Sequence, residues 1–270
     1  MEQDEQIERR RRAEALPGKL LKRAFFEAPP ERVAPLLLGK LLVHRTRGGL
    51  LAGRIVETEA YLGPHNDPPD PAAHAHGGPT PRNGVLFGPA GHAYVYSIYG
   101  RYFCMNISCE VEGRAGCVLL RALEPVAGLK QMGRNRGLPP HGRRPNLTPA
   151  SKNRSLGAPI VCRDPGLGSG ATARQLTSGP SRLCQAIGLA RVTHNGLDLL
   201  DAASPLQVRD DGLRVKRVLV TRRIGIRHAV DLPLRFALAG NACVSGPKAI
   251  GGKCILPQAG PVGKQKPVRY

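Results

Sequence analysis

Apolar and polar residues alternate in several short stretches of the chain, and this alternation predicts β-strands. Residues 41–45 and 53–59 show the pattern, and Arg47-Gly48-Gly49 between them is a hairpin signal. An apolar run at 117–125 predicts a further strand. The last strands are expected at 213–220 and 234–239.

Two short helices are expected among the strands. The first begins at Pro29-Pro30-Glu31 and ends at Gly39, and the second covers 181–187 and ends at Gly188. No internal repeat or linker is visible, so the pattern favours one domain at 21–245.

Three segments lack apolar periodicity and are expected to have little regular structure. Residues 1–20 are densely charged and 246–270 are rich in Gly, Lys and Pro, which indicates two mobile tails. Residues 131–175 are rich in Arg, Gly and Pro and predict a long loop within the domain.

Aromatic residues are concentrated in the stretch YVYSIYGRYFCMN at 94–106, which holds four of the six tyrosines of a chain without tryptophan. Its alternation breaks at Tyr99-Gly100-Arg101, which predicts a hairpin with the glycine at positive φ. Tyr94 and Tyr96 then share a face. Most aromatic strands belong to a core, and that remains one interpretation. A tip tyrosine between Ile98 and a Gly-Arg pair is poorly placed for a core and well placed to enter a stack of bases.

The charge of the chain favours a nucleic-acid partner. Lys and Arg total 40 against 20 Asp and Glu, a formal net charge of +20, which is the electrostatic footprint of phosphate binding. A membrane surface is the second possibility. No apolar run approaches the roughly 18 residues of a spanning helix, and no secretion signal is expected. Seven cysteines without CxxC spacing argue against a disulfide framework or zinc ribbon and predict a reducing compartment.

Two glutamates and one arginine are candidate catalytic residues. Glu57 and Glu59 are two residues apart on a predicted strand and are expected on the same face as Ile55. A carboxylate in so apolar a place has a raised pKa and suits a general base; a solvent-facing acidic pair is the alternative. Arg121 ends an apolar strand and needs an anionic partner such as Glu59.

Two irregular stretches complete the pattern. Residues 64–87 are rich in Pro, Gly and His and predict an ordered surface loop, in which the i, i+2 spacing of His74 and His76 is weak evidence for a metal. Residues 221–228 form a basic turn with one glycine. It either approaches phosphates through backbone N–H groups or is a plain surface loop.

Seven blocks of sequence together resemble one family, the alkyladenine (3-methyladenine) DNA glycosylases, in order between about Leu20 and Leu238. They are VETEAYLG at 56–63, AAH at 72–74, TPRN at 80–83, the stretch 94–106, LLRALEP at 119–125, SGPS at 178–181 and RIGI at 223–226. The resemblance implies an α+β fold with a curved antiparallel sheet, a protruding hairpin and peripheral helices.

The resemblance also implies base-excision repair. Such an enzyme flips an alkylated or deaminated purine (3-methyladenine, ethenoadenine or hypoxanthine) out of duplex DNA and hydrolyses its N-glycosidic bond, leaving an abasic site. By position in the blocks, Glu59 resembles the general base and Arg121 the residue that helps to hold the water. The resemblance places Tyr61, His74, Tyr96 and Asn106 in the base pocket. It implies that four residues contact the DNA: the wedge Tyr99, Arg101, Tyr102 and Arg82.

Further expectations follow for the partners and the reaction. The blocks contain no lysine, so we expect a monofunctional hydrolase that uses water, without a metal or other cofactor. The expected partner is double-stranded DNA, and the protein is expected to be a monomer. Its expected location is the cytoplasm (nucleoid) of a bacterium or the nucleus of a eukaryote. The chain departs from the family in a longer, Pro-rich segment at 64–74, in Arg101 at the tip and in the enlarged loop 131–175.

Two other functions fit part of this pattern. A non-catalytic module, for instance an RNA-binding domain, would use the same tyrosines as a stacking platform. An inactive relative would only recognise lesions. Glu59 with Arg121 argues against the simple binder, because such a protein gains nothing from a negative charge among its phosphate contacts. Release of free base from lesion-containing duplexes separates all three functions.

Overall fold

The computed structural model describes residues 16–138, 173–246 and 253–255. Within them, ten strands form one sheet in which every pair is antiparallel. Along the main path the order is β1 (Lys19–Leu20), β7 (Leu206–Asp210), β2 (Leu41–Thr46), β3 (Gly49–Tyr61), β6 (Gly116–Ala127), β5 (Tyr102–Cys109) and β4 (Ala93–Ile98). Off this path, β9 (Arg235–Leu238) pairs with β3 and β8 (Val218–Thr221), and β10 (Lys253–Ile255) pairs with β8.

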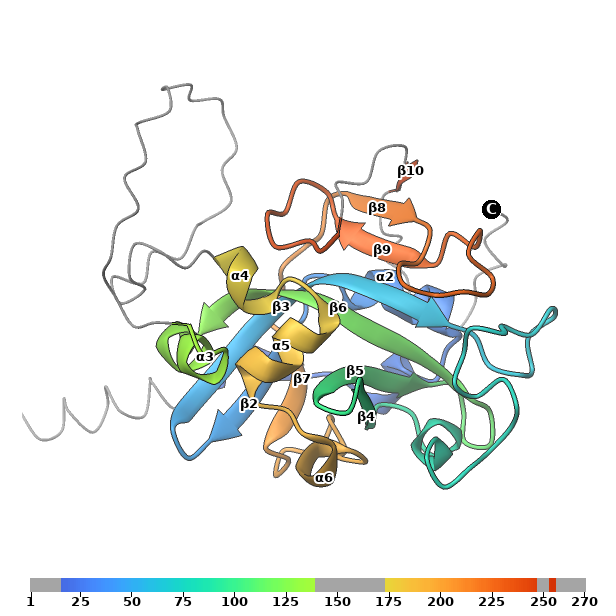
Figure 1. Cartoon of the computed structure of the whole chain (residues 1–270), viewed down its shortest axis with the longest axis horizontal. Helices are drawn as coiled ribbons and strands as arrows, with labels where there is room; N and C mark the ends of the chain where they lie inside the picture. Colours follow the sequence, from blue (N-terminus) through green and yellow to red (C-terminus); the bar gives the residue numbers. More distant parts are fainter. Residues whose placement is uncertain (1–15, 139–172, 247–252, 256–270) are drawn as a thin grey trace, which may run out of the picture.

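Short helices cover the sheet on both sides (Figure 1). They are α2 (Pro30–Leu37), α3 (Leu129–Asn135), α4 (Ala173–Thr177), α5 (Pro180–Ile187) and α6 (Arg191–His194), with 3₁₀ turns at Arg23–Phe25 and Gly84–Phe87. In Figure 1, α4 and α5 lie in front of β3 and β6, whereas α2 lies behind them. The Thr58 hydroxyl on β3 donates to the Ala34 carbonyl of α2 at 2.9 Å. No helix in the described part of the chain has the length and apolar character to cross a bilayer.

The main core lies where the helices meet the central strands. Buried residues of α2 and α5, such as Leu37 and Leu183, pack with Ile55 of β3 and Leu120 of β6. Helix α5 ends where Gly188 adopts φ 79°, a left-handed conformation that favours glycine. Burial of apolar faces on these short elements accounts for most of their stability.

The α+β class and the single antiparallel sheet confirm the expectation from the sequence. Helix α2, strand β2, the hairpin of β4 and β5, strand β6 and helix α5 lie where the pattern predicts them. Strand β3 begins at Gly49 rather than at residue 53, because Thr46 closes a tighter turn: its hydroxyl donates to the Gly49 carbonyl and accepts from Gly48 N–H.

Other predictions differ from the structure. Strand β7 was not expected, and of the predicted strand 213–220 only Val218 onward is extended. The ends of the expected loop 131–175 form α3 and α4, because Met132 and Leu176 bury their side chains in the core. Residues 139–172 lie outside the described part.

Two short strands fall in segments predicted as tails. Strand β1, at the end of the segment 1–20, pairs with β7, and β10, within 246–270, pairs with β8. Backbone pairing with an available sheet edge fixes these residues, although their sequence has no apolar alternation. The remaining residues of both tails, except 16–18 and Gly246, lie outside the described part.

Candidate active site

The antiparallel register places four residues in one row across four strands. Tyr94 of β4 is opposite Asn106 of β5, Asn106 is opposite Leu119 of β6, and Leu119 is opposite Glu59 of β3. Directly paired residues share a face of the sheet, so Glu59 and Asn106 face the same side, separated by two strand spacings of about 4.8 Å each. Tyr96 and Tyr61, two residues further along their strands, share that face.

Two irregularities in the pairing of β3 with β6 determine which residues reach this face. Ile55 is opposite Leu123 and Glu57 is opposite Ala122, so Val56 is an extra residue in β3. The next pair joins Thr58 to Leu120, so Arg121 is the extra residue in β6. Such bulges reorient side chains and are frequent beside active sites.

The first bulge corrects one expectation. Ile55 was predicted to share a face with the two glutamates, but it packs in the main core with Leu123, whereas Val56 packs with Ala122, the partner of Glu57. The extra residue therefore turns the glutamates away from the main core. The second bulge frees the Arg121 carbonyl from the ladder, and it accepts a hydrogen bond from Gly179 N–H at 3.0 Å. This contact connects the SGPS block to the site.

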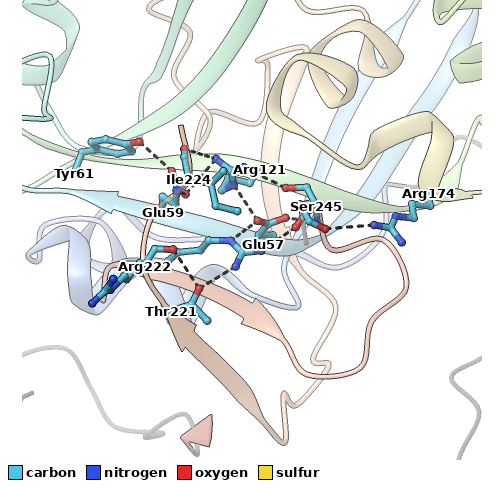
Figure 2. Close-up of polar contacts among 11 residues, drawn as sticks. Glu57, Glu59, Tyr61, Arg121, Arg174, Thr221, Arg222, Ile224 and Ser245 are labelled. Carbon is cyan, nitrogen blue, oxygen red and sulfur yellow. Dashed lines mark hydrogen bonds and ion pairs between the residues drawn. The ribbon is translucent and has the colours of Figure 1, made fainter. Parts of the chain in front are cut away.

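Glu59 is fully buried and has partners for both carboxylate oxygens (Figure 2). Oε1 accepts from Ile224 N–H at 2.7 Å and lies 3.2 Å from Nη1 of Arg121. Oε2 accepts from the Tyr61 hydroxyl at 3.0 Å. Burial raises the pKa of Glu59; Arg121, Ile224 N–H and Tyr61 oppose this in decreasing order, and the nearby charge of Glu57 adds to it. The predicted pairing of Arg121 with Glu59 is confirmed.

Ile224 lies in the basic turn 221–228, for which the sequence left two interpretations. Its N–H group binds the Glu59 carboxylate. A hydrogen bond to the charged form stabilises that form, so this turn helps to keep Glu59 ionised.

Three aromatic rings form a cluster at the Tyr94 end of the row that contains Glu59. Tyr94 and Tyr96 stack with centroids 5.4 Å apart, and the ring of His74 meets Tyr96 edge-on at 4.4 Å. The Tyr94 hydroxyl lies 3.0 Å from Nδ1 of His74. Burial and then the charge of Arg82 lower the pKa of His74, so the imidazole is neutral at physiological pH.

The loop 64–87 is ordered by two buried polar side chains that the sequence analysis did not assign. Asn83 holds the His74 and Gly78 carbonyls through Nδ2, at 2.8 and 3.0 Å. Asp70 accepts from Leu62 and Ala72 N–H groups and binds Arg223 at 2.5 Å. Asn83 lies in the TPRN block and Arg223 in the RIGI block. Membership of these blocks was the sequence signal that could have identified the two residues.

Arg223 connects this loop to the site. It is fully buried with Asp70, and its guanidinium carbon lies 4.7 Å from the centroid of the Tyr61 ring. A cation over an aromatic face fixes the ring and polarises it. Tyr61 is thus held by Arg223 on one face and by Glu59 at its hydroxyl.

The predicted DNA contacts are exposed to solvent; the three at the hairpin tip lie apart from this cluster, whereas Arg82 lies beside it. Tyr99 is 90% exposed at the hairpin tip and has φ 48°, followed by Gly100 at φ 73°. Tyr102 is 41% exposed and Arg101 is also exposed. Arg82 is exposed and, with His74 and Tyr94, lines a pocket of about 190 Å³. The hairpin turn therefore confirms the predicted conformation at Gly100.

The structure brings Glu59, Arg121 and Tyr61 into direct contact and gathers His74 and Tyr96 beside them. Asn106 is buried in the same row, with its Oδ1 3.6 Å from the Cys117 sulfur. Among the described residues, no three His, Cys, Asp or Glu side chains are grouped so as to hold a metal ion.

Comparison with known proteins gives consistent matches over most of the chain. The family described as Methylpurine-DNA glycosylase (MPG) matches residues 24–242. A Koribacter versatilis protein is 44% identical over 226 residues, which cover 84% of this chain and 93% of that protein. A Methanoculleus marisnigri protein is 43% identical, covering 82% and 96%, and a Burkholderia lata protein is 41% identical, covering 86% and 93%. All three carry the provisional name 3-methyladenine DNA glycosylase.

Proposed function

This chain belongs to the methylpurine-DNA glycosylase family, and from that premise we propose that it excises alkylated or deaminated purines from duplex DNA. The substrates are 3-methyladenine, ethenoadenine and hypoxanthine in DNA. The enzyme flips the damaged nucleotide out of the helix, hydrolyses its N-glycosidic bond with an activated water and leaves an abasic site. It acts as a monomer where the chromosomal DNA lies, in the cytoplasmic nucleoid of a bacterium or in the nucleus of a eukaryote.

The observation that carries this proposal is the buried carboxylate of Glu59 beside a tyrosine ring and an arginine. A carboxylate with a raised pKa accepts a proton from water more readily than an ordinary one, and base catalysis contributes about 10²–10⁴-fold. Its negative charge also favours the positive charge that develops on the sugar as the bond breaks. Arg121 keeps the group ionised and offers a donor to the same water.

The rings of Tyr61, His74 and Tyr96 are the proposed walls of the pocket for the flipped base. Extruding a base costs a few kcal/mol, least for a damaged or mispaired base. Each stacked ring returns about 1–3 kcal/mol, so this set is large enough to offset that cost. Asn106, in the row of Glu59, is proposed to disfavour the exocyclic amine of guanine.

Tyr99 is the proposed wedge that fills the gap in the duplex. Its ring is almost wholly exposed, which is costly for a residue without a partner and expected for one that stacks on bases. Arg101, Tyr102 and Arg82 are proposed to contact the DNA backbone around it.

The reaction is proposed to be monofunctional, without a lyase step. The blocks that form the site contain no lysine that could attack the sugar. Borohydride treatment of enzyme mixed with lesion DNA should therefore trap no covalent adduct. A trapped adduct would show that an amine, and not water, attacks.

Release of free base from duplex oligonucleotides tests the function. Wild-type protein is expected to release base from duplexes with hypoxanthine, ethenoadenine or 3-methyladenine. Glu59→Gln should bind the same duplexes and release none, and Asp211→Asn, at a remote ion pair with Arg54, should act as wild type. Binding without release by the wild type would favour an inactive lesion binder, and preference for RNA would favour the RNA-binding alternative. Turnover by Glu59→Gln would assign the base elsewhere, first to Glu57.

A further inference from the structure

Glu57 is a second buried carboxylate beside the site, and its hydrogen-bond partners are two arginines and a backbone N–H group rather than the pocket rings. It is 0% exposed. Oε1 accepts from Nε of Arg121 at 2.9 Å and from Nε of Arg235 at 2.7 Å, and Oε2 accepts from Ser245 N–H at 2.6 Å. Three of the roughly four acceptor sites of this carboxylate are therefore occupied by protein donors, two of them guanidinium groups.

Ser245 reinforces the same arrangement with three of its own atoms. Its N–H donates to Glu57, its hydroxyl accepts from Nη2 of Arg121 at 3.3 Å, and its carbonyl accepts from Nη2 of Arg235 at 2.9 Å. Figure 2 shows Ser245 and Glu57 on one side of Arg121 and Glu59 on the other. The serine is 5% exposed, so these bonds are shielded from water.

Arg121 needs such support because of where it lies. It is the extra residue in the β6 bulge, so no register partner on β3 restrains it. Its Nε and Nη2 atoms are bound by Glu57 and Ser245. Nη1 is then directed at Glu59, 3.2 Å away, and at the Ile224 carbonyl, 3.5 Å away. Arg235 donates to the Thr221 hydroxyl through Nη1 at 2.9 Å and to Oε1 of Glu57 through Nε, so it restrains Glu57 as well. The two glutamates and two arginines form one charge-balanced cluster.

We propose that Glu57 and Ser245 are positioning residues for the excision reaction, which orient Arg121 so that it presents Nη1 to Glu59 and to the attacking water. This inference rests on the proposed glycosylase function. Both residues act through Arg121 and neither touches the base or the sugar. Orientation errors of about 1 Å in such groups cost up to about 100-fold in rate.

Single-turnover excision of hypoxanthine from duplex DNA, with enzyme in excess and over a range of pH, tests this proposal. Glu57→Gln should slow excision by about 100-fold at saturating enzyme. Its dissociation constant for lesion DNA should stay within about twofold of wild type, because the variant leaves the binding surface unchanged. The acid limb should move to higher pH, because a displaced Arg121 lowers the pKa of Glu59 less, and this outweighs the smaller opposite effect of losing the Glu57 charge.

Ser245→Ala is the milder variant and removes only the hydroxyl bonded to Arg121. It should slow excision by about tenfold, the loss of one hydrogen bond to a charged group. Ser204→Ala, which deletes another buried hydroxyl remote from the site, and Asp198→Asn, which breaks the ion pair with Arg23, are the matched controls and should excise at the wild-type rate.

The outcomes separate the two proposals. Wild-type rates and an unchanged acid limb in folded Glu57→Gln and Ser245→Ala would overturn the positioning role. Loss of activity only in proportion to loss of folded protein would show a purely structural role and also overturn it. Excision abolished in Glu57→Gln but retained in Glu59→Gln would make Glu57 the base. A wild-type protein that releases no base would overturn the function itself, and the positioning role with it.

Discussion

Nη1 of Arg121 lies 3.2 Å from Oε1 of Glu59, and this ion pair opposes the effect of burial on the same carboxyl group. Burial raises the pKa of Glu59, and Arg121 is the strongest of the influences that lower it. The ionised fraction of Glu59, the proposed general base, therefore depends on the position of one guanidinium group.

Replacing Arg121 should shift the pH dependence of excision. In Arg121→Gln the pKa of Glu59 rises further, so the acid limb of the pH–rate profile moves to higher pH. Tyr61→Phe, which removes the hydroxyl bonded to Glu59, should move it in the same direction by less. Single-turnover rates across pH measure both shifts. An acid limb that stays in place in both variants would mean that a different group titrates.

Glu59→Gln should become more stable relative to wild type as the pH rises. The folded protein binds the Glu59 proton more tightly than the unfolded chain, whose glutamate has a pKa near 4.5. Wild-type stability from this group is therefore lost as the pH rises from 4.5 through the raised folded value, and the variant lacks that loss. Thermal denaturation of both proteins over this window provides the measurement. A difference between them that does not change with pH would contradict it.

A buried histidine pair should make the fold sensitive to acid. Nε2 of His44 on β2 lies 3.2 Å from Nε2 of His194 on α6. Nδ1 of His44 faces the Ile187 carbonyl at 2.8 Å and must donate, so its Nε2 accepts from His194 and both rings are neutral. Burial, the largest influence, lowers the pKa of both groups.

The sign of this effect follows from linkage. Histidines in the unfolded chain have a pKa near 6.5, and the pKa values of both histidines in the folded protein are lower. The stability that the pair contributes is therefore present above pH 6.5 and is lost as the pH falls through the folded pKa values. His194→Gln keeps a donor for His44 but does not titrate. Its melting temperature should fall less steeply below pH 6.5 than that of wild type, and equal slopes would rule out the pair as the cause.

Asp70→Asn should destabilise the protein by about 3–5 kcal/mol, because it leaves the buried charge of Arg223 without its anion. Urea denaturation measures the change. Asp211→Asn, at a partly exposed ion pair with Arg54, should cost less than about 1 kcal/mol and serves as the control. A loss of similar size in both variants would contradict a special role for the Asp70 pair.

Tyr99→Ala should weaken capture of lesion DNA and leave the fold intact. An exposed side chain without packing contributes within about 0.5 kcal/mol to stability. One stacking contact is worth about 1–3 kcal/mol, so affinity for hypoxanthine DNA should fall by about 5- to 150-fold. Fluorescence anisotropy and thermal denaturation separate these effects. A lower melting temperature with unchanged affinity would favour the interpretation that the hairpin belongs to the core.

Local patterns predicted most of the elements because alternation and turn glycines act within a few residues. The hairpin at 94–106 is the clearest case, since Gly100 and the flanking tyrosines determine both the turn and the shared face. The pairing of Arg121 with Glu59 was also predictable, because an arginine in an apolar strand needs an anion nearby.

The supporting contacts were not predictable, because they join residues far apart in the chain. Arg223 and Asp70 are separated by 153 positions, and Ser245 and Glu57 by 188. No periodicity connects such pairs; only the closure of the sheet brings them together. The bulges were also invisible, since an extra residue leaves the composition of a strand unchanged.

A strand has two sides, and which side a residue occupies depends on whether an odd or even number of positions separates it from a fixed point. The single supernumerary residue between Ile55 and Glu57 sets that parity for everything after it in β3. Without the bulge, regular alternation through Val56 would put the acids of the string ETEAYLG on the side of Ile55, toward the apolar interior. Whether this block can serve the proposed catalysis therefore depends on the register of the residue that precedes it.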